Sequence, residues 1–381
     1  MNLRDFFDAG KRRKALEDDL NLDLSNIGNF SLDETRASSR NCENMIGVTQ
    51  VPLGIAGPLI FRSQLATPNS FYVALATTEG ALVASINRGC KAISESGGAT
   101  VLSKKVGITR APVFKVKNII EGQKVIGWLE DNFNKIKKVA ESTSSHLELI
   151  SIKPWLVGRN LYVRLGFDTM DAMGMNMATI AATEVVKHIE EVTKINCVAV
   201  SGNMCVDKKP NYLNFIEGRG YTVWAEVVLP EKVISSILKT EKEKILEVAE
   251  RKLHVASILS GMIGSNAQMA NVMAAIFLAT GQDIAHVAEC ATGITTVEDA
   301  GEGLYVSIYL PDLVVGTVGG GTELATQKEA LSIMSGGVKL TGQEFAERIG
   351  GAVLAGEISL LASLAEGSLA RAHERYGRGN K

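Results

Sequence analysis

Glu79 is an isolated acid in the segment ATTEG, where we predict that a helix opens at Thr77 or Thr78. An acid in the first turn of a helix is commonly stabilised by the helix dipole and needs no further role. Its neighbour Gly80 costs about 1 kcal/mol in a helix relative to alanine. Glycine is tolerated there mainly where a backbone or a ligand must come close. The pair therefore raises the prospect of a proton donor beside a bound molecule.

Asp283 and Lys208 are the charged residues that could work with this acid. Asp283 ends the segment GQD behind an apolar helix, where a carboxylate is unfavourable unless a cation pairs with it. The segment VDKKP offers two lysines, and Pro210 restricts Lys209 to an extended conformation, so their side chains should diverge. A solvated turn is the simpler interpretation of an isolated lysine pair. A lysine between Glu79 and Asp283 would instead stabilise an oxyanion and tune a carboxylate pKa for acid catalysis.

Glycine-rich segments offer a surface for a nucleotide. VGTVGGGTE at 315–323 follows a predicted strand, and DAMGMN at 171–176 opens a predicted helix that Asp171 could cap. Both segments could bring backbone amides close to phosphates, although most glycine turns are only turns. The chain contains no G-x-G-x-x-G motif, so a Rossmann domain is not supported.

The remaining candidates for metal or nucleophilic chemistry are weak. Five cysteines are widely spaced without a CxxC pair, which favours a reducing compartment and argues against a metal site. His373 lies on a basic C-terminal segment. The other histidines have no partner at ligand spacing, and we expect them to be structural or surface residues: His146, His188, His254 and His286.

Composition narrows the class of protein. The 381 residues carry a formal net charge of −2 with acids and bases interspersed, which argues against a nucleic acid partner. The start of the chain is charged and lacks the apolar core of a signal peptide, and the apolar run VMAAIFLA is too short to span a bilayer. We expect a soluble cytoplasmic protein with no membrane partner.

Hydrophobic periodicity predicts an α+β fold with an inserted module. Between residues 112 and 199, strand and helix patterns alternate in the order β-α-β-β-α-β, which is the ferredoxin-like arrangement. We predict a helical N-terminal segment over 1–49, a large mixed helix and sheet domain over 50–111 and 200–381, and the small domain over 112–199. The small-residue pattern further predicts one helix across 261–280.

Several of these segments occur together in one known family and in the same order. They are ENMIGVTQVPLGIAGPL, ATTEGALVASINRGC, DAMGMNM, SGNMCVDKKP, NFIEGRG, GQD, VGTVGGGTELATQK and LAGEISLLASLAEG. The chain resembles the catalytic portion of 3-hydroxy-3-methylglutaryl-coenzyme A (HMG-CoA) reductases from about residue 43 to 373, in a soluble class I form.

The resemblance implies reduction of HMG-CoA to mevalonate and free CoA with two NAD(P)H. It implies that Glu79 is the proton donor, that Lys208 stabilises the oxyanion, that Asp283 tunes both, and that His373 protonates the CoA thiolate. The substrate-binding residues that it implies are Ser85, Asn87, Arg88, Arg110, Ser201, Asp207, Lys209 and Asn271. The cofactor-binding residues that it implies are Ser144, Ser145, Asp171, Met173, Gly174, Met175, Asn176, Gly319, Gly320 and Gly321.

The resemblance also implies a homodimer with shared active sites, in which Lys208 reaches Glu79 of the other subunit; a higher assembly is left open. We expect NADPH as the cofactor, with NADH as the alternative. Relatives commonly carry a basic residue where this chain has Ser145, and Asp168 would favour NADH if it faced the ribose. Two other functions compete with the reductase: mevalonate oxidation with NAD, and an inactive CoA-binding paralogue, which should have lost at least one of the four catalytic residues.

Overall fold

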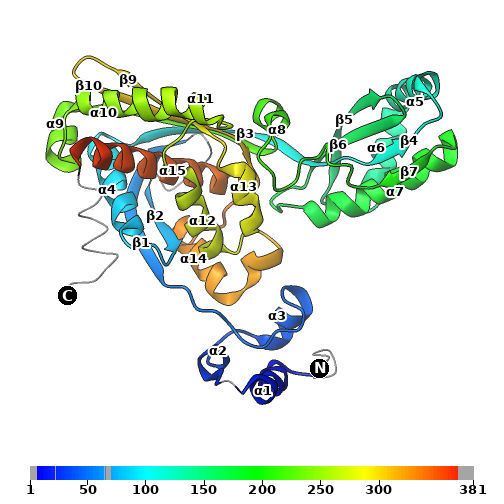
Figure 1. Ribbon diagram of the computed structural model, residues 1–381, viewed down its shortest axis with the longest axis horizontal. Helices are drawn as coiled ribbons and strands as arrows, with labels where there is room; N and C mark the ends of the chain where they lie inside the picture. Colours follow the sequence, from blue (N-terminus) through cyan, green and yellow to red (C-terminus); the bar gives the residue numbers. More distant parts are fainter. Residues whose placement is uncertain (1–6, 22, 64, 66–69, 368–381) are drawn as a thin grey trace.

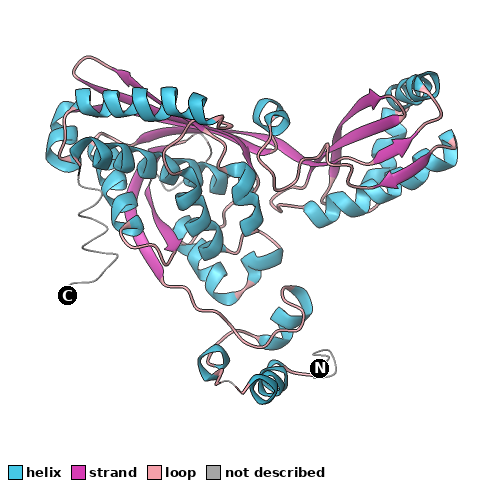
Figure 2. Ribbon diagram, viewed as in Figure 1, coloured by secondary structure: helices cyan, strands magenta, loops and turns pink. Residues whose placement is uncertain are grey.

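The chain folds into three parts that are seen side by side in Figure 1. The computed structural model describes residues 7–21, 23–63, 65 and 70–367. Short helices form the N-terminal part: α1 (Ala9–Leu20), α2 (Ser25–Gly28) and α3 (Glu34–Arg40). A large body of helices and sheet and a smaller body joined to it make up the rest (Figure 2).

The sheet of the large body is mostly antiparallel. Its strands follow the order β2 (Ser70–Ala76), β1 (Leu53–Arg62), β3 (Ala99–Arg110), β8 (Gly220–Pro230), β10 (Gly303–Leu313) and β9 (Ile294–Asp299). The one parallel pair among them is β1 with β3. Inward-facing residues alternate with exposed ones along β8, as expected for a strand covered on one face.

Helix α15 (Gly342–Glu366) forms the centre of the large body. It packs on β3 and β8 and contacts α4 (Leu82–Glu95), α10 (Lys242–Val248) and α12 (Met269–Thr280). Its mean hydropathy reaches 1.4 over 18 residues, but 78% of that window is buried inside the protein, as for a core helix. No other helix in the described part of the chain has the length and hydropathy to cross a membrane.

The smaller body contains the predicted alternation of strands and helices. Its elements are β4 (Val113–Lys115), α5 (Ile119–Asp131), α6 (Phe133–Glu141), β5 (Glu148–Val157), β6 (Asn160–Asp168), α7 (Met175–Thr193) and β7 (Asn196–Ala199). The strands are antiparallel in the order β7-β4-β6-β5. The first crossover contains two helices where we predicted one, because the chain breaks at Asn132.

Strand β3 connects the two bodies. Its first half pairs with β8 in the large body, and Ile108–Arg110 at its end pair with β6 in the smaller one. In Figure 1 this strand crosses the space between the bodies. The two sheets are therefore continuous through one strand.

Two helices begin later than the sequence predicts. Helix α4 begins at Leu82, because Ala81 adopts a left-handed conformation with φ of 74°. Helix α12 begins at Met269, because Gly264 is left-handed and the Ala267 and Gln268 N–H groups that follow it donate to Glu357 instead of to a helix. The segment 261–268 is thus a loop, and Glu79 lies in a turn before α4 rather than in its first turn.

The remaining helices of the described chain are short. They are α8 (Tyr212–Glu217), α9 (Glu231–Val233), η2 (Ile234–Leu238), η3 (Ala249–Ala256), α11 (Ser257–Ser260), η4 (Ile284–His286), α13 (Val287–Cys290), η5 (Gly320–Glu323) and α14 (Ala325–Ser335).

Candidate active site

A cavity of about 1050 Å³ lies where the segments predicted to hold substrate and cofactor meet. Its wall includes residues 171–177 at the start of α7, the loop 281–283 after α12, and residues 318–322 around η5. Arg110, Asp207 and Lys208 line the same space. Segments far apart in the sequence therefore form one site.

Gln282 joins two walls of this cavity. Its amide donates to the carbonyl oxygen of Gly316 at 3.0 Å and accepts from the Gly316 N–H at 3.0 Å. Gly281 ends α12 in a left-handed conformation, and a Cβ there would lie 2.3 Å from the carbonyl oxygen of Gly321. These glycines are required because the two backbones approach each other without room for a side chain.

Lys208 and Asp283 form a close ion pair at the cavity wall. Lys208 Nζ lies 2.6 Å from Asp283 Oδ2, and Asp283 Oδ1 accepts from the Ala285 N–H at 3.1 Å as the cap of η4. Burial raises the pKa of Asp283, but the hydrogen bonds from Lys208 and Ala285 and the nearby His286 outweigh it, so the pKa is lowered overall. Asp283 is therefore an anion at neutral pH, held against a cation.

The loop that carries Lys208 has an unusual backbone. Val206 and Lys208 have φ of 45° and 60°, a region that β-branched residues rarely adopt. Asn214 donates to the Val206 carbonyl at 3.1 Å, and the Lys208 N–H donates to Glu289 Oε1 at 3.1 Å. Buried partners thus hold a strained backbone that directs Lys208 toward Asp283.

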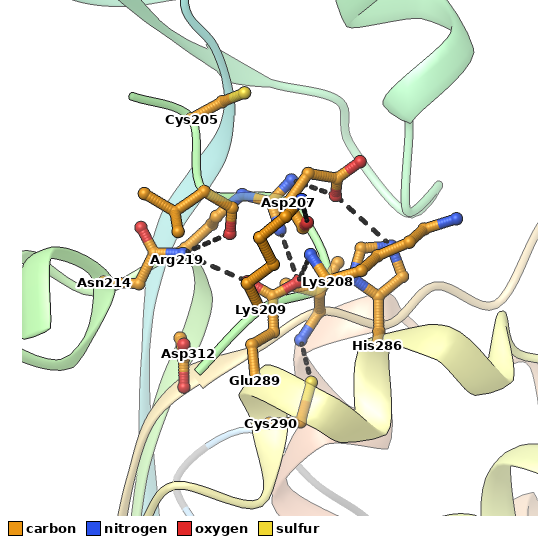
Figure 3. A network of polar contacts seen from close by, with 12 residues as sticks. Cys205, Asp207, Lys208, Lys209, Asn214, Arg219, His286, Glu289, Cys290 and Asp312 are labelled. Atoms are coloured by element: carbon orange, nitrogen blue, oxygen red, sulfur yellow. Dashed lines mark hydrogen bonds and ion pairs between the residues drawn. The ribbon is translucent and has the colours of Figure 1, made fainter. Parts of the chain in front are cut away.

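A buried polar network lies behind the pair (Figure 3). Arg219 is fully buried and donates to Glu289 Oε1 at 2.8 Å and to Asp207 Oδ1 at 2.9 Å. His286 Nδ1 lies 2.6 Å from Glu289 Oε1, and Asn214 donates to Glu289 Oε2 at 3.0 Å. Removing one member would leave a buried charge unpaired, which is strongly destabilising.

Asp207, His286 and Glu289 lie within 4.8 Å of one another, a spacing that could hold a metal ion. The Arg219 guanidinium already donates to both carboxylates and supplies the positive charge at this position. Arg219 therefore offsets part of this negative charge, and the absence of a metal site stays a prediction.

Arg110 extends the network toward the cavity. Its NH1 lies 3.9 Å from Asp207 Oδ2 and donates to Ser201 Oγ at 3.5 Å. Arg110 thus has a weakly held guanidinium at the cavity wall, which suits a carboxylate ligand. Lys209, the next lysine along the chain, is exposed and donates to the Asp207 carbonyl at 3.1 Å.

The predicted cofactor residues mostly share the cavity. The residues that line it are Asp171, Met173, Gly174, Met175, Asn176, Gly319, Gly320 and Gly321. Ser144 and Ser145 do not line it, whereas the next residue, His146, does. Asp171 does not cap α7, because Gly174 is the capping residue; Asp171 instead accepts from the Gly342 N–H at the start of α15 at 2.9 Å.

Other predicted site residues lie outside this cavity. Glu79 is exposed before α4, and its carboxylate is not part of the cavity wall. Ser85 and Arg88 bond Ser359 of α15, at 3.0 Å from Ser85 Oγ and 3.1 Å from Arg88 Nε. Asn87 and Asn271 are likewise not among its lining residues, and neither are Ser201 and Lys209. His373 lies outside the described residues.

A family model described as hydroxymethylglutaryl-coenzyme A reductase matches residues 8–378. The chain belongs to this family. The 3-hydroxy-3-methylglutaryl-coenzyme A reductase of Methanocaldococcus jannaschii is 50% identical over 373 residues, which cover 96% of this chain and 92% of that protein. The reductase of Pyrococcus abyssi is 50% identical over 377 residues, with the same coverage of each chain.

Solved reductase structures share the fold. The class II HMG-CoA reductase of Streptococcus pneumoniae bound to NADPH matches with a TM-score of 0.69 at 17% identity, covering 93% of this chain and 96% of that one. At this identity the likeness concerns the fold alone. This structure is of a class II enzyme, so it does not support the class I form that we predict from the sequence.

The sequence analysis did not identify the buried residues that hold the Lys208 loop in place. Arg219 and Glu289 carry no signal of their own, because their partners are distant in sequence. His286 was predicted to be structural or at the surface, yet it is fully buried beside three carboxylates. The three-residue spacing from Asp283 to His286 to Glu289 was the available signal, since it places side chains on one face of a helical turn.

Proposed function

We propose that the chain reduces HMG-CoA to mevalonate and CoA with two reduced nicotinamide cofactors. The observation that carries this proposal is the Lys208–Asp283 pair at 2.6 Å, set in a cavity whose other walls are DAMGMN and the triple glycine. Two relatives that are named HMG-CoA reductases and are 50% identical to this chain support the proposal. Two hydrides and two protons convert the thioester carbon to a primary alcohol, the C–S bond breaks, and CoA leaves as a thiol.

The charged residues of the cavity have different roles in this reaction. The Lys208 ammonium stabilises negative charge that develops on the carbonyl oxygen, and Asp283 fixes the orientation of that ammonium. Arg110 binds the free carboxylate of the substrate, with Asp207 and Ser201 holding the guanidinium in place. Glu79 as the proton donor, and His373 as the acid for the thiolate, remain proposals from the family resemblance.

The triple glycine suits a dinucleotide. Gly319 and Gly320 have φ of 80° and 58°, and a Cβ at either position would meet no atom within 4 Å. Their backbone is therefore open to the cavity, which fits binding of phosphate by N–H groups. A nicotinamide cofactor bound there supplies the hydride. We further infer that residues 112–199 are the cofactor-binding domain in a ferredoxin-like arrangement, supported by the strand order β7-β4-β6-β5.

NADPH is the cofactor that the charges favour. Lys339 and His146 line the cavity, and no ion pair involves either residue within the described chain. Asp168, which would repel a 2′-phosphate, is paired with Lys105 and accepts from the Met170 N–H at 2.8 Å. Lys339→Ala should therefore raise KM for NADPH and leave KM for NADH unchanged. Titration calorimetry with 2′-phospho-AMP and AMP would test the same point without turnover.

A homodimer would complete the site. Glu79 does not line the cavity that holds Lys208, so a donor from a second subunit fits the proposed chemistry. Exposed apolar side chains that a partner could cover include Val255, Ile258 and Leu259, of which Leu259 is 87% exposed. A cytoplasmic location stays a prediction.

The decisive experiment measures oxidation of NADPH and of NADH with HMG-CoA and counts cofactor consumed per CoA released. Two cofactors per CoA would support the reductase, and a preference for NADPH would support Lys339 as its determinant. Oxidation of mevalonate with NAD in the presence of CoA, faster than the forward reaction, would favour the catabolic alternative. No turnover in either direction would favour the inactive CoA-binding alternative.

A further inference from the structure

His286 has an environment that a structural histidine does not need. It is fully buried, and its Nδ1 lies 2.6 Å from Glu289 Oε1. Its Nε2 lies 3.8 Å from Asp207 Oδ1 and 3.9 Å from Asp283 Oδ2, and has no hydrogen-bond partner among the described residues. A buried ring nitrogen without a partner is uncommon and calls for an explanation.

The surroundings of Glu289 decide the tautomer of this imidazole. Oε1 accepts from Arg219 and from the Lys208 N–H, and Oε2 accepts from Asn214. A carboxylate that faces donors on both oxygens is stabilised as an anion and can only accept. The hydrogen between Glu289 and His286 therefore resides on Nδ1, and Nε2 is the ring nitrogen that faces Asp207 and Asp283.

Charges from every neighbouring segment act on that nitrogen. The carboxylates of Asp207 and Asp283 are nearest to Nε2, and that of Glu289 lies on the other side of the ring. Arg219 and Lys208 pair with these carboxylates and offset part of their charge. Asp312 on β10 is also close enough to act on Glu289. Without a proton on Nε2, the three nearest carboxylates exceed these two cations by one negative charge.

We propose that His286 is a positioning residue for the reaction, with Glu289 fixing its ring so that Nε2 faces Asp283 Oδ2 and Asp207 Oδ1 and orients Asp283 through electrostatic attraction. Asp283 Oδ2 is the atom that also holds the Lys208 ammonium at 2.6 Å. When the Lys208 ammonium interacts with the substrate oxygen, its ion pair with Asp283 weakens. When both ring nitrogens of His286 carry a proton, the Nε2 N–H points between Asp283 and Asp207 and adds a compensating positive charge there.

This inference rests on the proposed reductase activity, and three variants test it. His286→Asn keeps an amide where Nδ1 meets Glu289 but removes the group facing Asp283. His286→Gln places an amide N–H near the position of Nε2. His286→Ala removes both. His188→Asn is the matched control, because His188 also has a buried Nε2 without a partner but packs on Trp128 in the smaller body.

We expect kcat of His286→Asn to fall by about 10²-fold, the scale of a misplaced catalytic group, with little change in KM for HMG-CoA. His286→Gln should recover most of the lost kcat, because its amide N–H can face Asp283. His188→Asn should match the wild type in kcat and in KM for HMG-CoA.

Two outcomes would overturn the inference. One is a folded His286→Asn protein with wild-type kcat. The other is a folded His286→Gln protein whose kcat is as low as that of His286→Ala. An inactive wild-type enzyme would instead count against the proposed function, so the two failures are distinguishable. Thermal unfolding of each variant separates a loss of fold from a loss of positioning.

Discussion

The Lys208–Asp283 pair is only partly exposed, with side-chain exposures of 38% and 34%, so its value lies in geometry more than in stability. Solvent screens much of the attraction, but the lysine is held by a strained backbone, by Asp283 and by the network around Glu289. Such preorganisation lowers the reorganisation needed when charge develops on a substrate oxygen. The pair is therefore expected to act on kcat more than on folding.

Lys208→Ala and Asp283→Asn should each reduce kcat by about 10²- to 10³-fold, the effect of losing one oxyanion-stabilising group. Both proteins should remain folded, because the Lys208 and Asp283 side chains are not part of the buried core. Lys209→Ala is the comparison, with an effect expected on KM for HMG-CoA. Steady-state kinetics with circular dichroism checks this, and near-normal turnover of Asp283→Asn would contradict the mechanism.

Acidification should reveal the lowered pKa of Asp283. Its folded-state pKa lies below the ordinary value of 3.8, so the carboxylate contributes stability above that value and loses it as the pH falls through the folded-state pKa. The difference in unfolding midpoint between the wild type and Asp283→Asn should be constant at neutral pH and should shrink in acid. A difference that grows on acidification would contradict the assigned shift.

At the scale of single residues, local electrostatics decides which parts of the site can be predicted from the sequence. The position of Asp283 behind an apolar helix required a cation, and the structure pairs it with a lysine of VDKKP. Arg219 and Glu289 could not be predicted in the same way, because they pair with each other across 70 residues of sequence, whereas His286 lies three residues from both Asp283 and Glu289. The backbone of Lys208 also has a positive φ angle, which a lysine in the sequence does not predict.

Helices α4 and α15 pack against each other in the core with their backbones in close contact at Gly89. A Cβ at Gly89 of α4 would lie 1.9 Å from the carbonyl oxygen of Ala355, so only glycine fits there. Ser85 and Arg88 on the same helix bond Ser359, which adds polar contacts at this interface. The register of these two helices is thereby fixed, and with it the loop that carries Glu79.

Gly89→Ala should destabilise the protein by about 1–3 kcal/mol through overpacking. Gly127→Ala on α5 is the control, because a Cβ there meets no atom within 4 Å. That change should be stabilising by about 0.5–1 kcal/mol, the helix propensity gained by replacing glycine. Thermal unfolding of the two variants measures both signs, and equal midpoints would show that the helices separate to admit a methyl group.

Helix and strand types were predictable from periodicity, whereas their starts were not. The order of strands and helices over 112–199 is the one that the pattern predicts, apart from the break in the first helix at Asn132. The segment 261–268 has helical small-residue spacing but forms a loop, because Glu357 accepts from the Ala267 and Gln268 N–H groups at 2.7 and 2.6 Å. A tertiary contact from α15 thus overrides local propensity.

At the scale of the whole molecule, the site depends on how the large body and the smaller body are joined. Within one chain, β3 fixes the smaller body to the large one, and their junction forms the cavity of Lys208 and Asp283. Glu79 remains outside that cavity. Sequence periodicity could not indicate this separation, because it contains no information on which subunit supplies a residue.

Complementation tests the shared site that this separation implies. Glu79→Gln and Lys208→Ala homodimers should each be inactive, but unfolding, mixing and refolding them together should produce heterodimers with one intact site. Equal amounts should give about a quarter of the wild-type activity, since half of the dimers would be mixed and each would carry one working site of two. Activity that stays at the level of the separate variants, in a mixture shown to contain heterodimers, would mean that Glu79 and Lys208 act within one chain. In that case a movement of the α4 loop toward the cavity would have to bring the two residues together.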